Sequence, residues 1–313
     1  MSPATNHLGI DVGGTKSLGV VVDADARIVR TARHATPHGA DAVIDTIVAL
    51  VDELGPVDTV GVGVAGLVTH DGVLRAAPNL PGIRELAVGD RLRRRLGRDV
   101  AVENDATCAT VAEWRLGAGD GVPEMLMVAL GTGIGGGVVS GGEIRRGRNG
   151  FAGEFGHMVI DPHGPPCVCG RRGCWERFAS GAGMARLARE AALGGRAARV
   201  VDLAGGDAEL VRGEHVQTAA REGDADALAV VDEFGRWVAL GLANLTNAFD
   251  PEVIVVGGGL VSGVDLYREP VERWFAELLY APEARPHPRL TVARLGEQAG
   301  AVGAALLGAG RAD

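Results

Sequence analysis

Three cysteines and one histidine between residues 154 and 176 have the spacing of a metal site. The segment is EFGHMVIDPHGPPCVCGRRGCWE, and the four side chains are His157, Cys167, Cys169 and Cys174. Three thiolates and one imidazole form the donor set of a closed, tetrahedral structural zinc site. A disulfide is the alternative, but it would leave one of the three thiols over, and reduced cysteines suit a cytosolic chain. The sequence therefore predicts a structural Zn²⁺ site.

Two carboxylates flank this segment. Glu154 lies three residues before His157, and Glu176 lies two residues after Cys174. A metal-bound loop would hold both carboxylates in fixed positions, and His157 could bind the metal through one ring nitrogen and donate a hydrogen bond from the other. Fixed acceptors and an N–H donor suit a substrate with several hydroxyl groups. The alternative is that both glutamates are ordinary solvated surface charges.

Asp105 is the candidate general base. It ends the predicted strand 99–105, and ligands of α/β sheets bind at the carboxyl ends of strands. Asp and Asn also cap helices, but Asn104 could cap the helix that follows and leave Asp105 facing a cleft. Phosphoryl transfer to a hydroxyl needs positioning, charge stabilisation and a carboxylate that accepts the proton. We expect Asp105 to take this role.

Three glycine turns follow predicted strands and could bind phosphate. Their residues are Gly13, Gly14, Thr15 and Lys16; Gly131, Thr132 and Gly133; and Gly257, Gly258 and Gly259. Backbone N–H groups of such turns can surround phosphate oxygens, although each turn alone is more often a hairpin or bulge. Neither a P-loop nor a dinucleotide-binding GxGxxG before a helix is present. Asp11, before the first turn, is either a partner of Mg²⁺-bound water or a turn-stabilising residue.

The pattern of strand, glycine turn and strand occurs twice. LGIDVGGTKSLGVVV and MLMVALGTGIGGGVV are about 120 residues apart, which suggests two related α/β lobes that face one cleft. The segment 117–123 is the expected hinge. We also expect helices at 40–54, 180–192, 215–250 and 267–279, a glycine-rich loop at 61–66 and a mobile segment at 194–215.

The composition limits the class of protein. With 313 residues, the chain is long enough for two domains. Its net charge of −9 argues against nucleic acid as a partner. The sequence has no apolar run of about 18 residues and no recognisable export signal, so we expect no membrane partner and a soluble cytoplasmic protein.

Taken together, the motifs resemble the ROK family (repressors, open reading frames and sugar kinases) of the actin-like ATPase superfamily, and most of all its bacterial glucokinases. In chain order they are IDVGGTK, GVGVAG, PNLPG, VEND, GTGIGGG, GEFGHM…CVCGRRGCWE and VIVVGGGLV. The resemblance implies an α/β fold with two actin-like ATPase (ribonuclease H-like) lobes around an interdomain cleft. The smaller domain would be 1–117, completed by a C-terminal helix at about 298–313, and the larger would be 118–297 with the zinc loop.

The resemblance also implies an activity, the ATP-dependent phosphorylation of glucose to glucose 6-phosphate with Mg²⁺. Asp105 would be the general base on the 6-hydroxyl. The first two glycine turns would meet the phosphates, and Gly257 to Gly259 the adenosine. The residues expected to hold the sugar are Gly66, Asn79, Asn104, Asp105, Glu154, His157 and Glu176. A homodimer or homotetramer is implied. The family often has a proline in the loop where this chain has Val64 to Leu67, so the shape of that loop is open.

Several alternatives remain at this stage. The sugar could be another hexose or N-acetylmannosamine, and the donor could be polyphosphate, because epimers differ by one hydroxyl only. A sugar-responsive repressor would need a DNA-binding helix-turn-helix of about sixty residues before the first glycine turn. Only ten residues precede Asp11. An inactive sugar-binding protein is disfavoured by the presence of Asp105.

Overall fold

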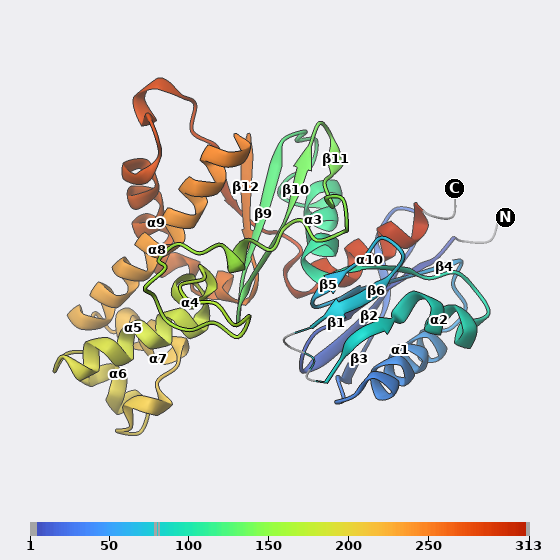
Figure 1. Cartoon of the computed structure of the whole chain (residues 1–313), viewed down its shortest axis with the longest axis horizontal. Helices are drawn as coiled ribbons and strands as arrows, with labels where there is room; N and C mark the ends of the chain where they lie inside the picture. The colour runs from blue at the N-terminus through green and yellow to red at the C-terminus, as the bar shows by residue number, and fades with distance from the viewer. Residues whose placement is uncertain (1–4, 78–79, 81, 311–313) are drawn as a thin grey trace. The chain divides into compact units, whose positions relative to one another are not determined.

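The computed structural model describes residues 5–77, 80 and 82–310, and its contacts divide the chain into two compact units (Figure 1). Unit 1 comprises the residues up to Leu126, Gly136–Gly153 and the residues from Arg294 onward. Unit 2 comprises Met127–Gly135 and Glu154–Ala293. The predicted domains, 1–117 completed by a C-terminal helix at about 298–313 and 118–297, remain a prediction.

Unit 1 is built on a five-stranded sheet with the strand order β3-β2-β1-β4-β8. The strands are β1 (His7–Val12), β2 (Lys16–Val22), β3 (Ile28–Ala35), β4 (Thr59–Val64) and β8 (Ala101–Asn104). The first three are antiparallel, whereas β4 and β8 run parallel to β1. Because β1, β4 and β8 are parallel, their carboxyl ends lie at the same end of the sheet, and Asp11 and Asp105 lie there.

Helices cover both faces of this sheet (Figure 1). Helices α1 (Ala40–Leu54) and α2 (Val88–Leu96) pack with Leu8, Ile10 and Val62 on one face. The opposite face, with Leu18 and Val20, is covered by α3 (Asp105–Leu116) and α10 (Ala299–Ala309). In β1, Leu8, Ile10 and Val12 point to the face covered by α1, whereas Gly9 exposes backbone on the opposite face.

Two strand glycines let α10 approach the sheet closely. A methyl group on Gly9 would lie 1.8 Å from the carbonyl oxygen of Ala301, and one on Gly61 would lie 1.8 Å from that of Ala304. The expectation of a glycine-rich loop over 61–66 is therefore wrong for residues 61–64, because these residues lie inside β4. Only Gly66, with φ of 130°, follows the strand in a conformation that favours glycine.

A second five-stranded sheet has the order β11-β10-β9-β12-β13. Its strands are β9 (Met125–Leu130), β10 (Ile134–Ser140), β11 (Glu143–Ile144), β12 (Val253–Gly257) and β13 (Arg289–Val292). The division between the units passes through β9 and β10. A small third sheet in unit 1 contains β5 (Leu67–Val68), β6 (Val73–Ala76) and β7 (Arg84–Ala87).

Unit 2 is mainly helical outside its strands. Its α-helices are α4 (Glu176–Ala179), α5 (Gly181–Leu193), α6 (Ala198–Leu203), α7 (Gly213–Arg221), α8 (Ala225–Phe249) and α9 (Val264–Leu278). Its 3₁₀ helices are η1 (Phe155–His157), η2 (Ala208–Leu210), η3 (Gly259–Gly263) and η4 (Pro282–Ala284), and a further one in unit 1 is η5 (Gly296–Gln298).

The structure confirms the helix predicted at 40–54 with both of its ends. The segment 194–215 contains α6, η2 and the start of α7, and its expected mobility remains a prediction. The helical periodicity expected over 215–250 is present as two helices, because the chain turns at Gly223 with φ of 85° and Asp224 then caps α8. Among the described residues, no helix is both long and apolar enough to cross a membrane.

Candidate functional site

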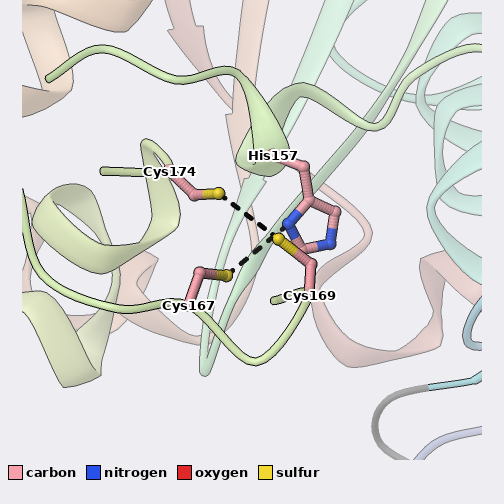
Figure 2. Close-up of side chains that lie close together, drawn as sticks. All are labelled: His157, Cys167, Cys169 and Cys174. Atoms are coloured by element: carbon pink, nitrogen blue, oxygen red, sulfur yellow. Dashed lines mark hydrogen bonds between the residues drawn. The ribbon is translucent and has the colours of Figure 1, made fainter. Parts of the chain in front are cut away.

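The four residues of the predicted metal site lie together in unit 2 (Figure 2). The Nδ1 atom of His157 lies 3.8 Å from the Sγ atom of Cys167, and the Sγ atoms of Cys169 and Cys174 are 3.5 Å apart. All four donor atoms lie within 4.8 Å of one another. A tetrahedral zinc ion with Zn–S bonds of about 2.3 Å requires ligand atoms about 3.8 Å apart. The arrangement therefore fits Zn²⁺.

Local backbone structure holds this cluster. The N–H of Cys167 donates to the carbonyl oxygen of Arg171 at 2.8 Å, and the N–H of Gly170 donates back to that of Cys167 at 3.0 Å. Gly170 has φ of 86°, which favours glycine in the tight loop. Trp175 is fully buried, and its indole N–H donates to the carbonyl oxygen of Trp237 at 2.8 Å. The metal loop is thus anchored to α8 immediately after its last cysteine.

The flanking carboxylates lie close to the cluster. The Nε2 atom of His157 is 3.9 Å from Glu154, so the ring presents Nδ1 to the cysteines and Nε2 to this carboxylate. The thiol of Cys167 donates to Oε1 of Glu176 at 3.0 Å. A methyl group on Gly133 would lie 2.7 Å from Oε2 of the same carboxylate. Glu176 therefore lies between the cluster of His157 and the three cysteines and the second glycine turn.

Unit 2 also contains a cavity of about 480 Å³ beside this turn. Two of the predicted glycine turns meet there, because Gly131, Thr132 and Gly259 all line it. The first residues of α5 and α7 lie in its wall, and helix N-termini favour anions. The remaining two glycines of the third turn do not line the cavity: Gly257 is buried in β12, and Gly258 turns the chain with φ of 88°. Gly133 contacts Glu176 instead.

Five polar residues of this cavity were not identified from the sequence. They are Arg189, Arg212, Glu214, Gln217 and Ser262. Two of them fall in the segment 194–215 that we expected to be mobile, and the other three lie on helices without a recognisable motif. The sequence signal that could have pointed to this cavity is the small residues at the helix starts, Gly181 and Ala182 in α5 and Gly213 in α7, because they leave room for a ligand.

In unit 1, Asn104 and Asp105 have different partners at the start of α3. The Oδ1 atom of Asn104 accepts from the N–H of Thr107 at 2.9 Å and caps the helix, while its Nδ2 donates to the carbonyl oxygen of Gly66 at 3.0 Å. Asp105 accepts from the N–H of Ala106 at 2.9 Å. Asn104 thus has the capping role that Asp105 would otherwise fill, and it brings the Gly66 loop to Asp105.

Asp105 acts electrostatically on Asp11 across Gly63. Asp11 pairs in register with Gly63, and a methyl group on Gly63 would lie 3.5 Å from the Cα atom of Asp105. Burial raises the pKa of Asp11 to about 7, with a further contribution from the negative charge of Asp105 and an opposing one from Lys16. Burial also raises the pKa of Asp105.

The helix that carries Asp105 is fixed at its far end by Glu113, which is fully buried. The Glu113 carboxylate accepts from the backbone N–H of Ala118 at 2.9 Å, of Arg294 at 2.8 Å and of Leu295 at 2.7 Å. This carboxylate ties α3 to the segment that follows β13. The position of Asp105 therefore depends on a residue two turns along its own helix.

The first glycine turn is exposed. The N–H of Gly13 donates to the carbonyl oxygen of Lys16 at 3.0 Å and closes the turn, while Gly14 and Thr15 face solvent. The Lys16 ammonium group pairs with Glu297 at 2.8 Å, and both side chains are about half exposed. Asn79 lies outside the described residues.

Comparison with known proteins gives a consistent picture. The ROK family model matches residues 7–310. A glucokinase of Streptomyces coelicolor is 38% identical over 304 residues, which are 95% of this chain and 96% of that protein. An N-acetylmannosamine kinase of Escherichia coli is 35% identical over 309 residues, with coverage of 97% and 98%.

Among solved structures, a ROK glucokinase from Streptomyces griseus in complex with glucose and AMPPNP is 40% identical and has a TM-score of 0.87, with 98% of this chain and 100% of that chain covered. This likeness confirms the predicted α/β fold of the actin-like ATPase class. Because both the family model and these relatives extend over almost the entire sequence, this chain belongs to the ROK family.

Proposed function

We propose that this chain is a glucokinase that transfers the γ-phosphoryl group of ATP to the 6-hydroxyl of glucose. The observation that carries the proposal is its 40% identity, over 98% of its length, with the solved glucokinase whose complex contains glucose and AMPPNP. The acidic pair at the sheet edge of unit 1 and the glycine-lined cavity of unit 2 supply the chemistry that such a transfer needs.

Asp105 is the proposed general base. A carboxylate accepts a proton best when its pKa approaches the working pH, and burial raises the pKa of Asp105. Asn104 and Gly66 would meet sugar hydroxyls beside it, and their mutual hydrogen bond fixes both groups. Asp11 would hold Mg²⁺ through water, since a carboxylate at a sheet edge is a suitable hard ligand. The turn from Gly13 to Lys16 would meet the phosphates, which requires Lys16 to exchange Glu297 for the phosphate.

Glu154, His157 and Glu176 are the proposed sugar contacts of unit 2. Zn²⁺ bound by His157 and the three cysteines would hold this loop rigid and keep the Cys167 sulfur deprotonated. A thiolate donates no hydrogen bond, so Oε1 of Glu176 would lose its present donor and accept from a sugar hydroxyl instead. With Nδ1 of His157 on the metal side, its Nε2–H is the ring's remaining donor.

The donor in this proposal is ATP. Small and apolar residues, among them Ala182, Ala185 and Leu260, form much of the cavity in unit 2. Such walls suit the flat, apolar faces of a nucleobase, whereas a polyphosphate chain has no group that would use them. Gly131 to Gly133 and Gly257 to Gly259 remain the proposed contacts of phosphates and adenosine. A homodimer or homotetramer is part of the proposal and can be tested by light scattering.

The experiment is a coupled assay of ADP formation over a panel of sugars, with ATP and with polyphosphate as donor. We expect glucose with ATP to give the highest kcat/KM, and Asp105→Ala to lower kcat by at least about 100-fold with little change in sugar affinity. Asp52→Ala is the matched control, since Asp52 is exposed on α1 and makes no side-chain hydrogen bond in the described structure. Preference for N-acetylmannosamine would favour the second candidate, which the relative of 35% identity supports. Normal turnover of Asp105→Ala would remove Asp105 from the mechanism.

A further inference from the structure

Gln217 is a polar side chain of the unit 2 cavity that has no partner in the described chain. It lies on α7 and lines the cavity, although it is only 9% exposed. Its amide makes no hydrogen bond or other polar contact with the described residues, so its donor and acceptor groups face the cavity. Most of the side chain is buried, but its amide atoms reach the open cavity and are available to a ligand.

The fold reserves space for this amide. A methyl group on Gly263, at the end of η3, would lie 2.8 Å from the Nε2 atom of Gln217 and 2.9 Å from its Oε1. Gly263 has φ of −109°, so its backbone conformation does not require glycine. The glycine matters here because it leaves room for the planar amide between α7 and η3, beside the apolar wall that contains Leu260.

We propose that Gln217 recognises the base of the nucleotide donor and selects a 6-aminopurine. A glutamine amide pairs with adenine through two hydrogen bonds, accepting from the 6-amino group and donating to N7. A 6-oxopurine presents acceptors at both positions, so the amide oxygen meets another oxygen or the amide flips and loses one bond. This inference rests on the proposed function, because it assigns the base to the cavity beside Gly131 and Gly259.

The other polar residues of the cavity suit different parts of a nucleotide. Arg212 and Glu214 are exposed and lie at the start of α7, where charged groups meet phosphate or ribose. Arg189 already donates to the carbonyl oxygen of Val211 at 2.9 Å. The buried, neutral and planar Gln217 is the group of this cavity that matches the edge of a base.

Two substitutions test the role of the amide independently. Gln217→Met keeps the length of the side chain and removes its hydrogen-bonding groups. Gly263→Ala leaves Gln217 unchanged but places a methyl group against its amide, which must move. Thr218→Val is the control, since Thr218 is an exposed residue of the same helix outside the cavity.

The readouts are kcat and KM for ATP and for inosine triphosphate, and calorimetric binding of ADP and of inosine diphosphate. The wild-type protein should prefer the adenine nucleotides. We expect Gln217→Met to weaken ADP binding and raise the KM for ATP about 10-fold, as the loss of one or two net hydrogen bonds predicts. The ratio of kcat/KM for ATP to kcat/KM for inosine triphosphate should fall toward one. The kcat and the KM for glucose should stay nearly unchanged. Gly263→Ala should shift the same quantities in the same direction.

Two results separate this inference from the proposed function. Unchanged ADP affinity and unchanged base preference in a folded Gln217→Met variant would overturn the role of Gln217 while leaving the kinase intact. Absence of ATP-dependent turnover in the wild-type protein would overturn the proposed function instead. In that case the affinities of the wild type and of Gln217→Met for ADP and for inosine diphosphate still decide whether Gln217 recognises the base, because a binding measurement requires no turnover. A melting temperature equal to that of the wild type confirms that each variant is folded.

Discussion

Replacing Asp11 by asparagine should stabilise the protein more at pH 8 than at pH 5. Folding moves the Asp11 carboxyl from water to the end of β1, where burial and the charge of Asp105 raise its pKa from 3.8 to about 7, against the opposing charge of Lys16. Asparagine keeps the size and shape of the side chain but has no proton to lose. The difference in stability between the two proteins therefore reports the titration of this carboxyl.

The sign of the effect follows from proton linkage. Below pH 3.8 the carboxyl is protonated in both the folded and the unfolded chain, and its burial has no ionisation cost. Between pH 3.8 and about 7 the unfolded chain has released the proton that the folded chain still holds, so wild-type stability falls as the pH rises. Above about 7 both forms are ionised and the cost stays constant.

The magnitude follows from the size of the shift. One pKa unit corresponds to about 1.4 kcal/mol, so about two units between pH 5 and pH 7 set an upper limit of about 3 kcal/mol. Asp11 retains some contact with water, which screens the charge, and we therefore expect about 1–2 kcal/mol. Asp11→Asn should gain this amount relative to the wild type between pH 5 and pH 8.

The assay is urea-induced unfolding followed by circular dichroism at pH 5, 6, 7 and 8, without nucleotide or divalent cations. Asp120→Asn, the same substitution at an exposed position, is the control. A difference between Asp11→Asn and the wild type that stays constant within about 0.5 kcal/mol over this range would refute the argument. If Asp11→Asn instead stabilised the protein more at pH 5 than at pH 8, the charge of Lys16 would outweigh burial in setting the pKa of Asp11.

Three further predictions concern the metal loop and the core. Cys169→Ser should lose the zinc that atomic absorption detects in the wild type and should melt earlier; one zinc per chain in the variant would show that Cys169 is not a ligand. Glu176→Gln should raise the KM for glucose about 10-fold and that for ATP less than about 2-fold, as loss of a charge-assisted hydrogen bond predicts; equal rises would place Glu176 away from the sugar. Gly61→Ala should cost about 1–3 kcal/mol in unfolding experiments, because its methyl group meets the carbonyl oxygen of Ala304, whereas Gly310→Ala, whose methyl group makes only an ordinary contact with the carbonyl oxygen of Leu306 at 3.7 Å, should cost little.

The features that the sequence predicted well depend on residues close together in the chain. The helix 40–54 has apolar residues at helical spacing, and three of the four metal-site donors lie within eight residues of one another. The capping role of Asn104 also involves only the first turn of the helix that follows it. Such patterns carry their own structural information, so they can be recognised without knowing the rest of the fold.

The features that it missed depend on distant partners. The segment 194–215 lacks a periodic pattern, yet Asp226 accepts from the N–H of Ala197 at 2.8 Å and Arg199 pairs with Glu222 at 2.7 Å to hold α6 in place. Gln217 is recognisable as a site residue only once η3 lies opposite it. Gly61 looked like a loop residue because its partner, Ala304, lies at the other end of the sequence.

The close fit of α10 against Gly9 and Gly61 has a consequence for biosynthesis. A ribosome completes β1 and β4 long before it reaches the helix that covers their glycine-rich face, and at 5–20 residues per second the delay is on the order of tens of seconds. During that interval the nascent sheet has a bare strip of backbone that only small side chains can cover. The amino-terminal half thus waits for nearly the whole polypeptide to be translated, and chaperones that bind incomplete chains have a long opportunity to act.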